Sequence, residues 1–254
     1  MKNFSRIFRL DKGKRKTYND IAMKNELLIK PIAYIRNDFK EKFGIPRQSG
    51  RAPSVLSEIV FEPEYRHPDA LRGIEGFSHL WLLFDFSKAH KTEWSATVRP
   101  PRLGGNTRVG VFASRSPFRP NPIGLSCVTL VGVETRENEG NVLLVAGADL
   151  LDGTPIFDIK PYLPFADCQA NATAGYAGEH ENYALQVLDP NGELAKIPEG
   201  KRVGLLECLQ DDPRPSYQDD PERVYGMSFG DYDIKFTVSK KILTVSSVDK
   251  AMER

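Results

Sequence analysis

The stretch FASRSPFRPNPIGLS, residues 112–126, combines side chains that can grip a ligand with residues that stiffen the backbone. Its three prolines fix φ and restrict the residue before each of them, so the loop would lose little entropy when a ligand binds. Phe118 can anchor the loop while Arg115, Arg119 and Asn121 face outward. We therefore expect a binding site here. The alternative is a structural proline corner between two strands.

The residues around this loop are strongly biased in charge, although the whole chain of 254 residues carries a net charge of only +1. Residues 94–133 contain no Asp or Glu, and their basic residues are Arg99, Arg102, Arg108, Arg115 and Arg119. Arginine suits forked contacts to phosphate, carboxylate or a base edge. A local positive surface indicates a polyanionic partner. The alternative is that each arginine pairs with a distant carboxylate.

The spacing of the cysteines and histidines indicates neither a metal centre nor a disulfide framework. Cys127, Cys168 and Cys208 lie far apart without a CxxC pair, and the histidines lack metal-ligand spacing. No apolar run approaches the ~18 residues of a membrane span, and the N-terminus lacks the apolar part of a secretory signal. We expect a cytoplasmic protein that holds no metal and contacts no membrane.

The elements that must position these residues are mostly strands. Runs rich in β-branched and aromatic residues, separated by Gly, Pro and Asn, occupy residues 55–62, 77–87, 107–114, 125–134 and 141–150. No alternation of strands with long helices is visible. The pattern predicts a mainly β protein, with a β-barrel body of about 150 residues rather than a doubly wound sheet.

We predict three parts in the chain. Residues 1–22 carry seven Lys or Arg against two Asp and form a basic arm that need not be native, because Met23 could be the true start. Residues 23–170 form the barrel. Residues 171–254 form a small α+β domain, with partly helical runs at 181–189 and 200–212 and strands at 231–239 and 240–248.

Several motifs occur in an order that resembles the TsaA-like family, also called TrmO. They are PRQSG (46–50), GFSHLWLLF (76–84), PPRLGG (100–105), GVFASRSPFRPNPIGLS (110–126) and DLLDGTPIFDIKPYLPFAD (149–167). DPRPSY (212–217), YGMSF (225–229) and DYDIKF (231–236) resemble the small C-terminal domain of its bacterial members. The resemblance extends from about residue 28 to about residue 248.

The resemblance implies an S-adenosylmethionine-dependent methyltransferase that acts on N6 of threonylcarbamoyladenosine at position 37 of tRNA. It also implies a β-barrel catalytic domain and a homodimer that completes the cofactor site across its interface. It places the cofactor against Pro46, Arg47, Gln48, Phe86, Ser87, Lys88, Arg115, Leu125, Asp152, Gly153, Thr154 and Pro155. We expect RNA contacts from Arg99, Arg102, Arg119, Asn121, Arg214 and Tyr217, with the C-terminal domain helping to bind tRNA.

The chemistry of methyl transfer indicates what these residues must do, which is to hold the cofactor in position. The methyl group of S-adenosylmethionine is already activated, so the enzyme must mainly align the reacting atoms. Arg47 or Arg115 could grip the cofactor's carboxylate, and Asp152 or a backbone carbonyl its ammonium. The alternative for Asp152 and Gly153 is a simple turn between strands.

The N6 atom must also lose a proton, and the sequence leaves open which group accepts it. Candidate bases are Asp149, Asp158 and Tyr162, while Lys160 could stabilise developing negative charge. A dedicated base need not exist. Two rival functions also stay open: a non-catalytic RNA-binding β-barrel, and an enzyme that clamps a phosphate with the Arg/Pro loop. Binding of S-adenosylmethionine would distinguish the methyltransferase from both.

Overall fold

The computed structural model describes residues 27–100, 103, 107–180, 183–215 and 220–251. Contacts within the chain divide it into two units, residues 1–30 and residues 31–254, and each is described by itself. Of the first unit, the structure describes only residues 27–30, which are exposed and have no regular structure. The predicted basic arm, residues 1–22, therefore lies outside the described residues.

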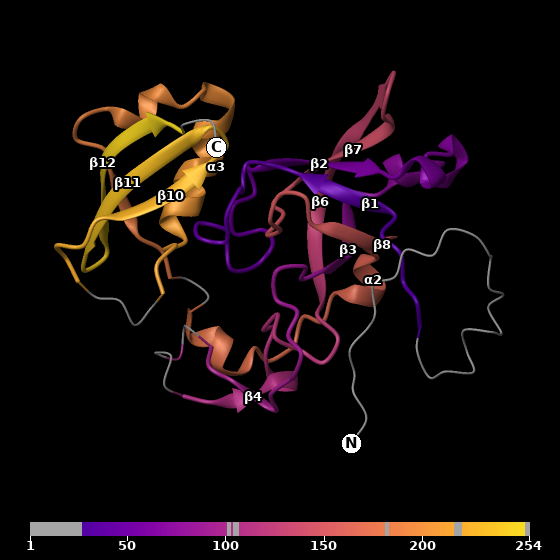
Figure 1. The fold of residues 1–254 in the computed structure, drawn as a ribbon, viewed down its shortest axis with the longest axis horizontal. Helices are drawn as coiled ribbons and strands as arrows, with labels where there is room; N and C mark the ends of the chain where they lie inside the picture. Colours follow the sequence, from indigo (N-terminus) through magenta and orange to yellow (C-terminus); the bar gives the residue numbers. More distant parts are fainter. Residues whose placement is uncertain (1–26, 101–102, 104–106, 181–182, 216–219, 252–254) are drawn as a thin grey trace. The chain divides into compact units, whose positions relative to one another are not determined.

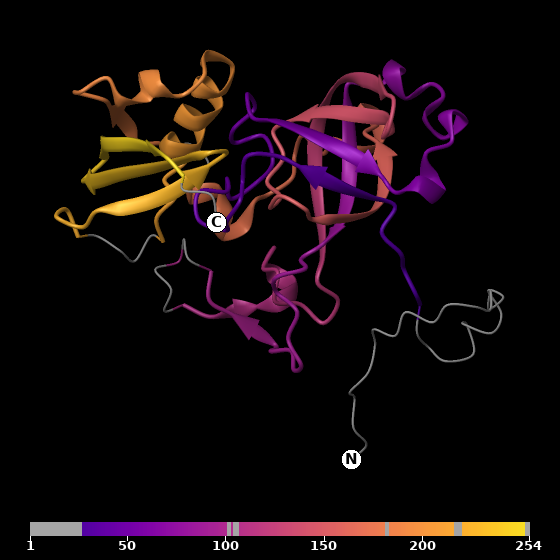
Figure 2. The same cartoon turned by 45° about the horizontal axis from the view of Figure 1, so that its top comes forward.

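A closed antiparallel sheet of six strands forms the first half of the second unit (Figures 1 and 2). Its order is β1-β2-β7-β6-β3-β8, and β8 pairs with β1 to close it. The strands are β1 (Ala33–Arg36), β2 (Leu56–Phe61), β3 (His79–Asp85), β6 (Ile123–Arg136), β7 (Gly140–Ala146) and β8 (Pro155–Pro161). The mainly β fold class is thus confirmed.

Alternating side chains fill the inside of the closed sheet. In β3 every second residue is buried, which places Leu80, Leu82 and Phe84 in the core while the residues between them face outward. Gly124 in β6 pairs with Phe84 in β3, and a Cβ there would lie 2.1 Å from the Phe84 ring. Only glycine leaves room for this ring at that position.

Short elements surround the closed sheet. β4 (Thr97–Val98) and β5 (Val109–Gly110) form a two-stranded sheet. The short helices are η1 (Pro63–Tyr65), η2 (Pro68–Leu71), η3 (Ile74–Gly76), η5 (Val111–Ala113), α2 (Pro164–Asp167) and η6 (Gly175–His180). The strand predicted at 107–114 is wrong for most of its length. Only its Val109 and Gly110 find partners, and the chain then turns through η5.

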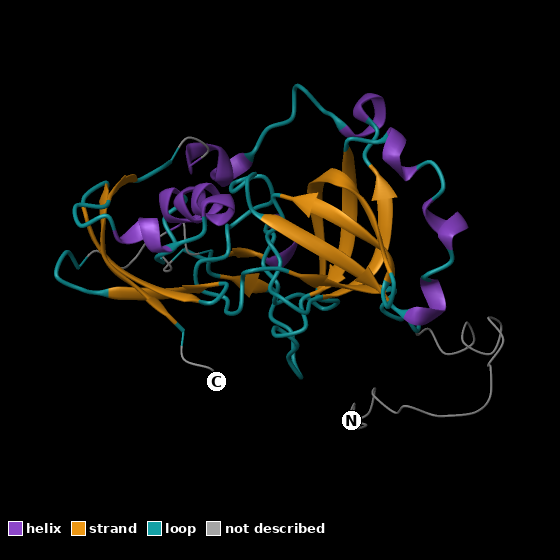
Figure 3. Cartoon of the chain, turned by 90° about the horizontal axis from the view of Figure 1, so that it is seen from above, coloured by secondary structure: helices purple, strands orange, loops and turns teal. Residues whose placement is uncertain are grey.

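A second, four-stranded sheet lies in the C-terminal part, in the order β10-β11-β12-β9. Its elements are β9 (Gln186–Leu188), η7 (Glu193–Lys196), α3 (Glu199–Gln210), β10 (Tyr225–Phe229), β11 (Tyr232–Ser239) and β12 (Ile242–Lys250). Figure 3 shows α3 beside this sheet, and Leu205 and Leu209 of α3 belong to its core. The helix and the hairpin are as predicted. The partly helical run at 181–189 is wrong, because β9 pairs with β12 instead.

The segment that connects β1 to β2, residues 37–55, joins the C-terminal core rather than the core of the closed sheet. Phe39, Ala52 and Val55 are buried with the side chains of α3 and the four-stranded sheet. Packing here is close, since a Cβ on Gly204 would lie 2.8 Å from Val55 Cγ2. The domain boundary near residue 170 stays a prediction, because residues from both sides of it share one core.

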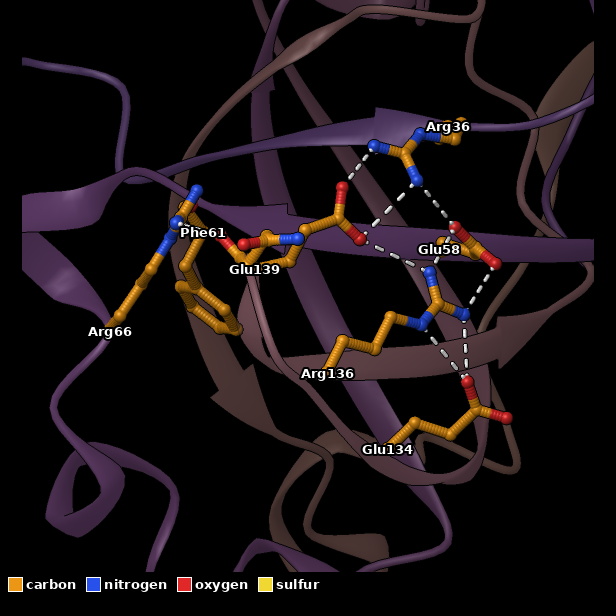
Figure 4. Close-up of polar contacts among 8 residues, drawn as sticks. Arg36, Glu58, Phe61, Arg66, Glu134, Arg136 and Glu139 are labelled. Carbon is orange, nitrogen blue, oxygen red and sulfur yellow. Dashed lines mark hydrogen bonds and ion pairs between the residues drawn. The ribbon is translucent and has the colours of Figure 1, made fainter.

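An ion network covers part of the outer surface of the closed sheet (Figure 4). Arg36 pairs with Glu58 at 3.1 Å and with Glu139 at 2.6 Å. Arg136 pairs with Glu58 at 2.8 Å and also contacts Glu134 and Glu139. We call these five residues the surface network. It ties β1 and β2 to the hairpin of β6 and β7.

Candidate functional site

The predicted cofactor loop and the arginine- and proline-rich loop meet through two side chains. Arg115 donates from Nη1 to Gln48 Oε1 at 2.6 Å, although 67 residues separate the two along the chain. The backbone N–H of Gly50 donates to the carbonyl of Gly147 at 2.9 Å, just beyond β7. Residues 46–50, the loop around Arg115 and the end of β7 therefore converge on one place.

Asp149 lies at the same place, two residues beyond Gly147. Ser126 Oγ, from β6, donates to its carboxylate. Burial raises the pKa of Asp149, while the Ser126 hydrogen bond and the nearby positive charge of Arg115 oppose that rise. A carboxyl with a raised pKa next to a guanidinium is typical of a functional site. We call Gln48, Arg115, Ser126 and Asp149 the convergent cluster.

The proline-rich loop is held in place by its own arginine. Arg119 donates from Nη1 to the carbonyls of Val111, at 3.2 Å, and Ser114, at 2.7 Å. The N–H of Phe86 donates to the carbonyl of Pro122 at 2.8 Å. Arg119 therefore stabilises the conformation that presents Arg115, and it is half-buried. Its predicted contact with RNA stays a prediction. The expectation that Phe118 anchors the loop in the core is wrong, because Phe118 is 41% exposed.

The DGTP turn, residues 152–155, is attached to the segment between β1 and β2. Asp152 accepts from the backbone N–H of Asn37 at 2.9 Å and from Lys40 Nζ at 2.8 Å. Gly153 has φ of +73°, a conformation that favours glycine, and Thr154 is buried. A ligand ammonium at Asp152 would have to share this carboxylate with Lys40, a residue that the sequence analysis did not identify.

The other predicted cofactor contacts are spread over two neighbouring strand ends. Phe86 is half-buried, whereas Ser87 and Lys88 are exposed after the end of β3. The carbonyl of Lys88 accepts from Lys42 Nζ at 2.8 Å. Leu125 is 55% exposed on the outward face of β6, opposite Leu83 of β3. Whether these residues touch a cofactor stays a prediction.

The three remaining candidates for proton transfer lie along and just after β8. Lys160 pairs with Asp158 at 2.7 Å. Desolvation raises the pKa of Tyr162, whose ring centroid lies 5.7 Å from that of Trp81. No contact found among the described residues links them to the convergent cluster. The structure thus brings Asp149 together with Gln48 and Arg115 and separates it from the other candidates.

The residues predicted to bind RNA have different surroundings. Arg99 and Asn121 are exposed, whereas Arg214 is only 6% exposed and pairs with Asp212 through Nε at 2.9 Å and Nη2 at 3.0 Å. This geometry gives no support for an RNA contact by Arg214. Arg102 and Tyr217 lie outside the described residues.

Arg47, predicted to contact the cofactor, faces the C-terminal part of the chain. Its guanidinium donates from Nη2 to the carbonyls of Asp212, at 3.4 Å, and Arg214. Its backbone N–H donates to Asp211 Oδ2 at 3.1 Å, and Arg51 Nε donates to Asp211 Oδ1 at 2.7 Å. Sequence analysis missed Arg51 and Asp211, because 160 residues separate them and no local pattern marks either.

Two further properties of the chain bear on its class. No group of three His, Cys, Asp or Glu that could hold a metal ion occurs within the described ranges. None of the helices that the structure describes combines the length and the apolar character needed to cross a membrane.

The closed sheet, the C-terminal sheet and the convergent cluster define a mainly β protein with a polar, arginine-bearing site at the end of β7. Residues 34–168 match the tRNA-methyltransferase O N-terminal domain family, and residues 196–251 match the TrmO C-terminal domain family. The chain therefore belongs to the TrmO family.

Individual relatives agree with this membership. The tRNA (adenine(37)-N6)-methyltransferase of Escherichia coli K12 is 43% identical over 217 residues, which cover 82% of this chain and 92% of the relative. The protein of the same name from Eikenella corrodens is 45% identical over 173 residues, covering 68% of this chain and 97% of the relative. The crystal structure of TrmO from Pseudomonas aeruginosa superposes with a TM-score of 0.72 at 35% identity, covering 90% of this chain and all of that one.

Proposed function

We propose that the chain transfers a methyl group from S-adenosylmethionine to N6 of adenine 37 in tRNA, on a base that already carries threonylcarbamoyl. The methyltransferase activity follows from family membership and from the 43% identity to the E. coli enzyme, and the cofactor from a Pseudomonas aeruginosa relative, 42% identical, named as a putative S-adenosylmethionine-dependent methyltransferase. The closed sheet serves as the β-barrel catalytic domain. The observation that carries the site assignment is the meeting of Gln48 and Arg115 beside Asp149.

The side chains at this place fit the cofactor's polar groups. S-adenosylmethionine carries a carboxylate, an ammonium and a sulfonium. Arg115 uses one guanidinium nitrogen on Gln48, and its other N–H groups have no hydrogen-bond partner among the described residues, so they can bind a carboxylate. Asp149 and Asp152 supply negative charge that suits an ammonium or a sulfonium. The exposed Leu125 and half-buried Phe86 offer apolar surface.

Asp149 is the strongest candidate for proton acceptor. When bound, the cofactor supplies an activated methyl group, so the protein's task is to align the reacting atoms and to accept one proton. Because burial raises the pKa of Asp149, its carboxylate is a better base than an exposed aspartate would be. Ser126 orients this carboxylate, and the positive charge of Arg115 opposes the rise of its pKa.

A pair of exposed aromatic rings supports two further proposals, contact with tRNA and dimer formation. Trp94 and Phe112 are 57% and 73% exposed, and their ring centroids lie 6.4 Å apart. Both belong to residues 94–133, the segment without acidic residues, and exposed aromatics beside arginines suit unpaired RNA bases. The same exposed surface would suit a second subunit. The homodimer and the cytoplasmic location stay predictions.

The proposed site is tested by comparing Arg115→Ala with Arg99→Ala. Arg115→Ala should weaken S-adenosylmethionine binding by about 10- to 100-fold in calorimetry, because a charge-assisted contact contributes about 1.5–3 kcal/mol. Arg99→Ala should leave that affinity unchanged and reduce the salt dependence of tRNA binding by about one unit of slope. Unchanged cofactor affinity in Arg115→Ala would remove Arg115 from the site.

The proposed base is tested by the pH dependence of methyl transfer. Wild-type activity should rise with pH through a pKa above the usual range of an aspartate, since only the ionised form accepts the proton. Asp149→Asn should abolish this rise of activity with pH and lower kcat by about 100-fold or more. A full rate in Asp149→Asn would show that water or another group takes the proton.

A further inference from the structure

We infer that Asp211, in the C-terminal part of the chain, is a positioning residue for cofactor binding. It acts by fixing the shape of residues 46–51, the loop that carries Gln48. This inference rests on the proposed function. In this proposal Asp211 acts through the loop and not directly on cofactor or substrate, and it lies 160 residues from its partner Arg51 along the chain.

Both carboxylate oxygens of Asp211 are used on this one loop. Oδ2 accepts from the backbone N–H of Arg47 at 3.1 Å, and Oδ1 accepts from Arg51 Nε at 2.7 Å. The two contacts bracket Gln48 in the sequence. The N–H of Arg51 also donates to the carbonyl of Gln48 at 3.4 Å. A single buried carboxylate thus fixes the loop on both sides of the residue that meets Arg115.

Asp211 is itself held rigidly. It is 5% exposed and caps the C-terminus of α3, where its N–H donates to the carbonyl of Glu207 at 3.0 Å. Glu207, one turn earlier, accepts from the backbone N–H and the hydroxyl of Ser54, both at 2.8 Å. The end of α3 therefore binds residues 47–54 through several hydrogen bonds. The low exposure of Asp211 strengthens its charge-assisted contacts.

Loop geometry matters here because S-adenosylmethionine must be held with its methyl group aligned to the nucleophile. Arg47 adds further contacts between this loop and the turn at 211–214, because it donates to the carbonyls of Asp212 and Arg214. Its guanidinium thus holds the backbone of the turn that follows α3. The turn at 211–214 therefore fixes the conformation of residues 46–51.

The test uses Asp211→Asn in the full-length chain. Asparagine keeps the size of the side chain and one acceptor oxygen but loses the charge. We expect the Kd of S-adenosylmethionine, measured by calorimetry, to rise by about 10- to 100-fold, with the KM for tRNA unchanged. In the cofactor-free protein, NMR should show faster hydrogen exchange at the Arg47 amide, with the amides of β7 unchanged. Arg51→Gln should reproduce both effects if Asp211→Asn fails to fold.

The matched control is Lys201→Met, which removes the 2.7 Å ion pair between Lys201 of α3 and Asp38. It loosens the same helix from the same segment, away from Gln48, and should leave the Kd unchanged. An unchanged Kd in a folded Asp211→Asn protein, beside a wild type that binds normally, would overturn the inference alone. A wild type that binds no S-adenosylmethionine would overturn the proposed function together with it.

Discussion

Two ion networks of similar composition have very different surroundings in this chain. The surface network is built from three glutamates and two arginines, with side chains such as Arg36 and Glu134 about half exposed. The second network joins Arg47 and Arg51 to the turn at 211–214, whose Asp211, Asp212 and Arg214 are 5%, 7% and 6% exposed. We call this second group the buried network.

The comparison shows that burial and connectivity, more than the number of ion pairs, decide what a network does. The surface network joins neighbouring strands that are already paired by their backbones, and water and salt weaken its charges. The buried network connects segments far apart in the sequence. Each buried charge there would be costly without its partner. Removing one charge should therefore lower the free energy of unfolding strongly in the buried network and only slightly in the surface network.

The largest effect is expected for Asp212→Asn in the buried network. Asp212 accepts from Arg214 Nε and Nη2 and from Tyr183 Oη, and the change would remove a negative charge that pairs with a buried guanidinium. We expect the free energy of unfolding in urea to fall by about 3–5 kcal/mol. Asparagine tolerates the φ of +54° at this position, so backbone strain does not contribute. A loss below about 1 kcal/mol would show that the buried network contributes no more to stability than the surface network does.

A smaller effect is expected where α3 packs against residues 54 and 55. Gly204→Ala would place a Cβ 2.8 Å from Val55 Cγ2 and 3.2 Å from its backbone N. Overpacking should cost about 1–3 kcal/mol, partly offset by the better helix propensity of alanine. Gly200→Ala, in the same helix with nothing within 4 Å, is the control and should stabilise by up to about 1 kcal/mol in thermal unfolding. Equal shifts for both variants would rule out close packing at Gly204.

The smallest effect is expected for Glu58→Gln in the surface network. Hydrogen bonding to Arg136 lowers the pKa of Glu58 despite partial burial. A lowered folded-state pKa stabilises the protein above the unfolded-state value, near pH 4.3, and this contribution disappears as the pH falls through the folded-state pKa. The variant should lose less than about 1 kcal/mol at pH 7, and the loss should shrink in acid and in about 1 M salt. A salt-independent loss of several kcal/mol would contradict the comparison.

Much of the closed sheet was predictable from the sequence, because its strands alternate or carry dense β-branched runs. The stretches at 55–62, 77–87 and 125–134 appear as β2, β3 and β6 within two residues at either end. β9 was missed because Val187 packs against the C-terminal core and pairs with β12 through tertiary contacts that no local pattern reveals. β8 went unassigned because Ile156 is the one buried residue of the strand, and Asp158 and Lys160, which form an ion pair, interrupt its apolar residues.

The site was predictable only in part. Arg115 was identified from the composition of its proline-rich loop and Gln48 by resemblance. The two lie in hydrogen-bond contact, although their contact with a cofactor stays a prediction. Asp149 was one of several equal candidates, and only its burial and its contact with Ser126 distinguish it. Asp211 and Arg51 could not have been predicted. Their roles depend on a contact between segments 160 residues apart, and a single sequence contains no signal for such pairing.

The segment between β1 and β2 has a consequence for how the chain is made. Its Phe39 and Val55 belong to the same core as residues of β10 and β11, which are synthesised well after them. At about 5–20 residues per second, on the order of 10–30 seconds separate the synthesis of Val55 from that of Tyr225. During that interval the segment carries exposed apolar side chains, so nascent chains stalled before residue 225 should be cut by protease within residues 37–55, and released full-length chains should not.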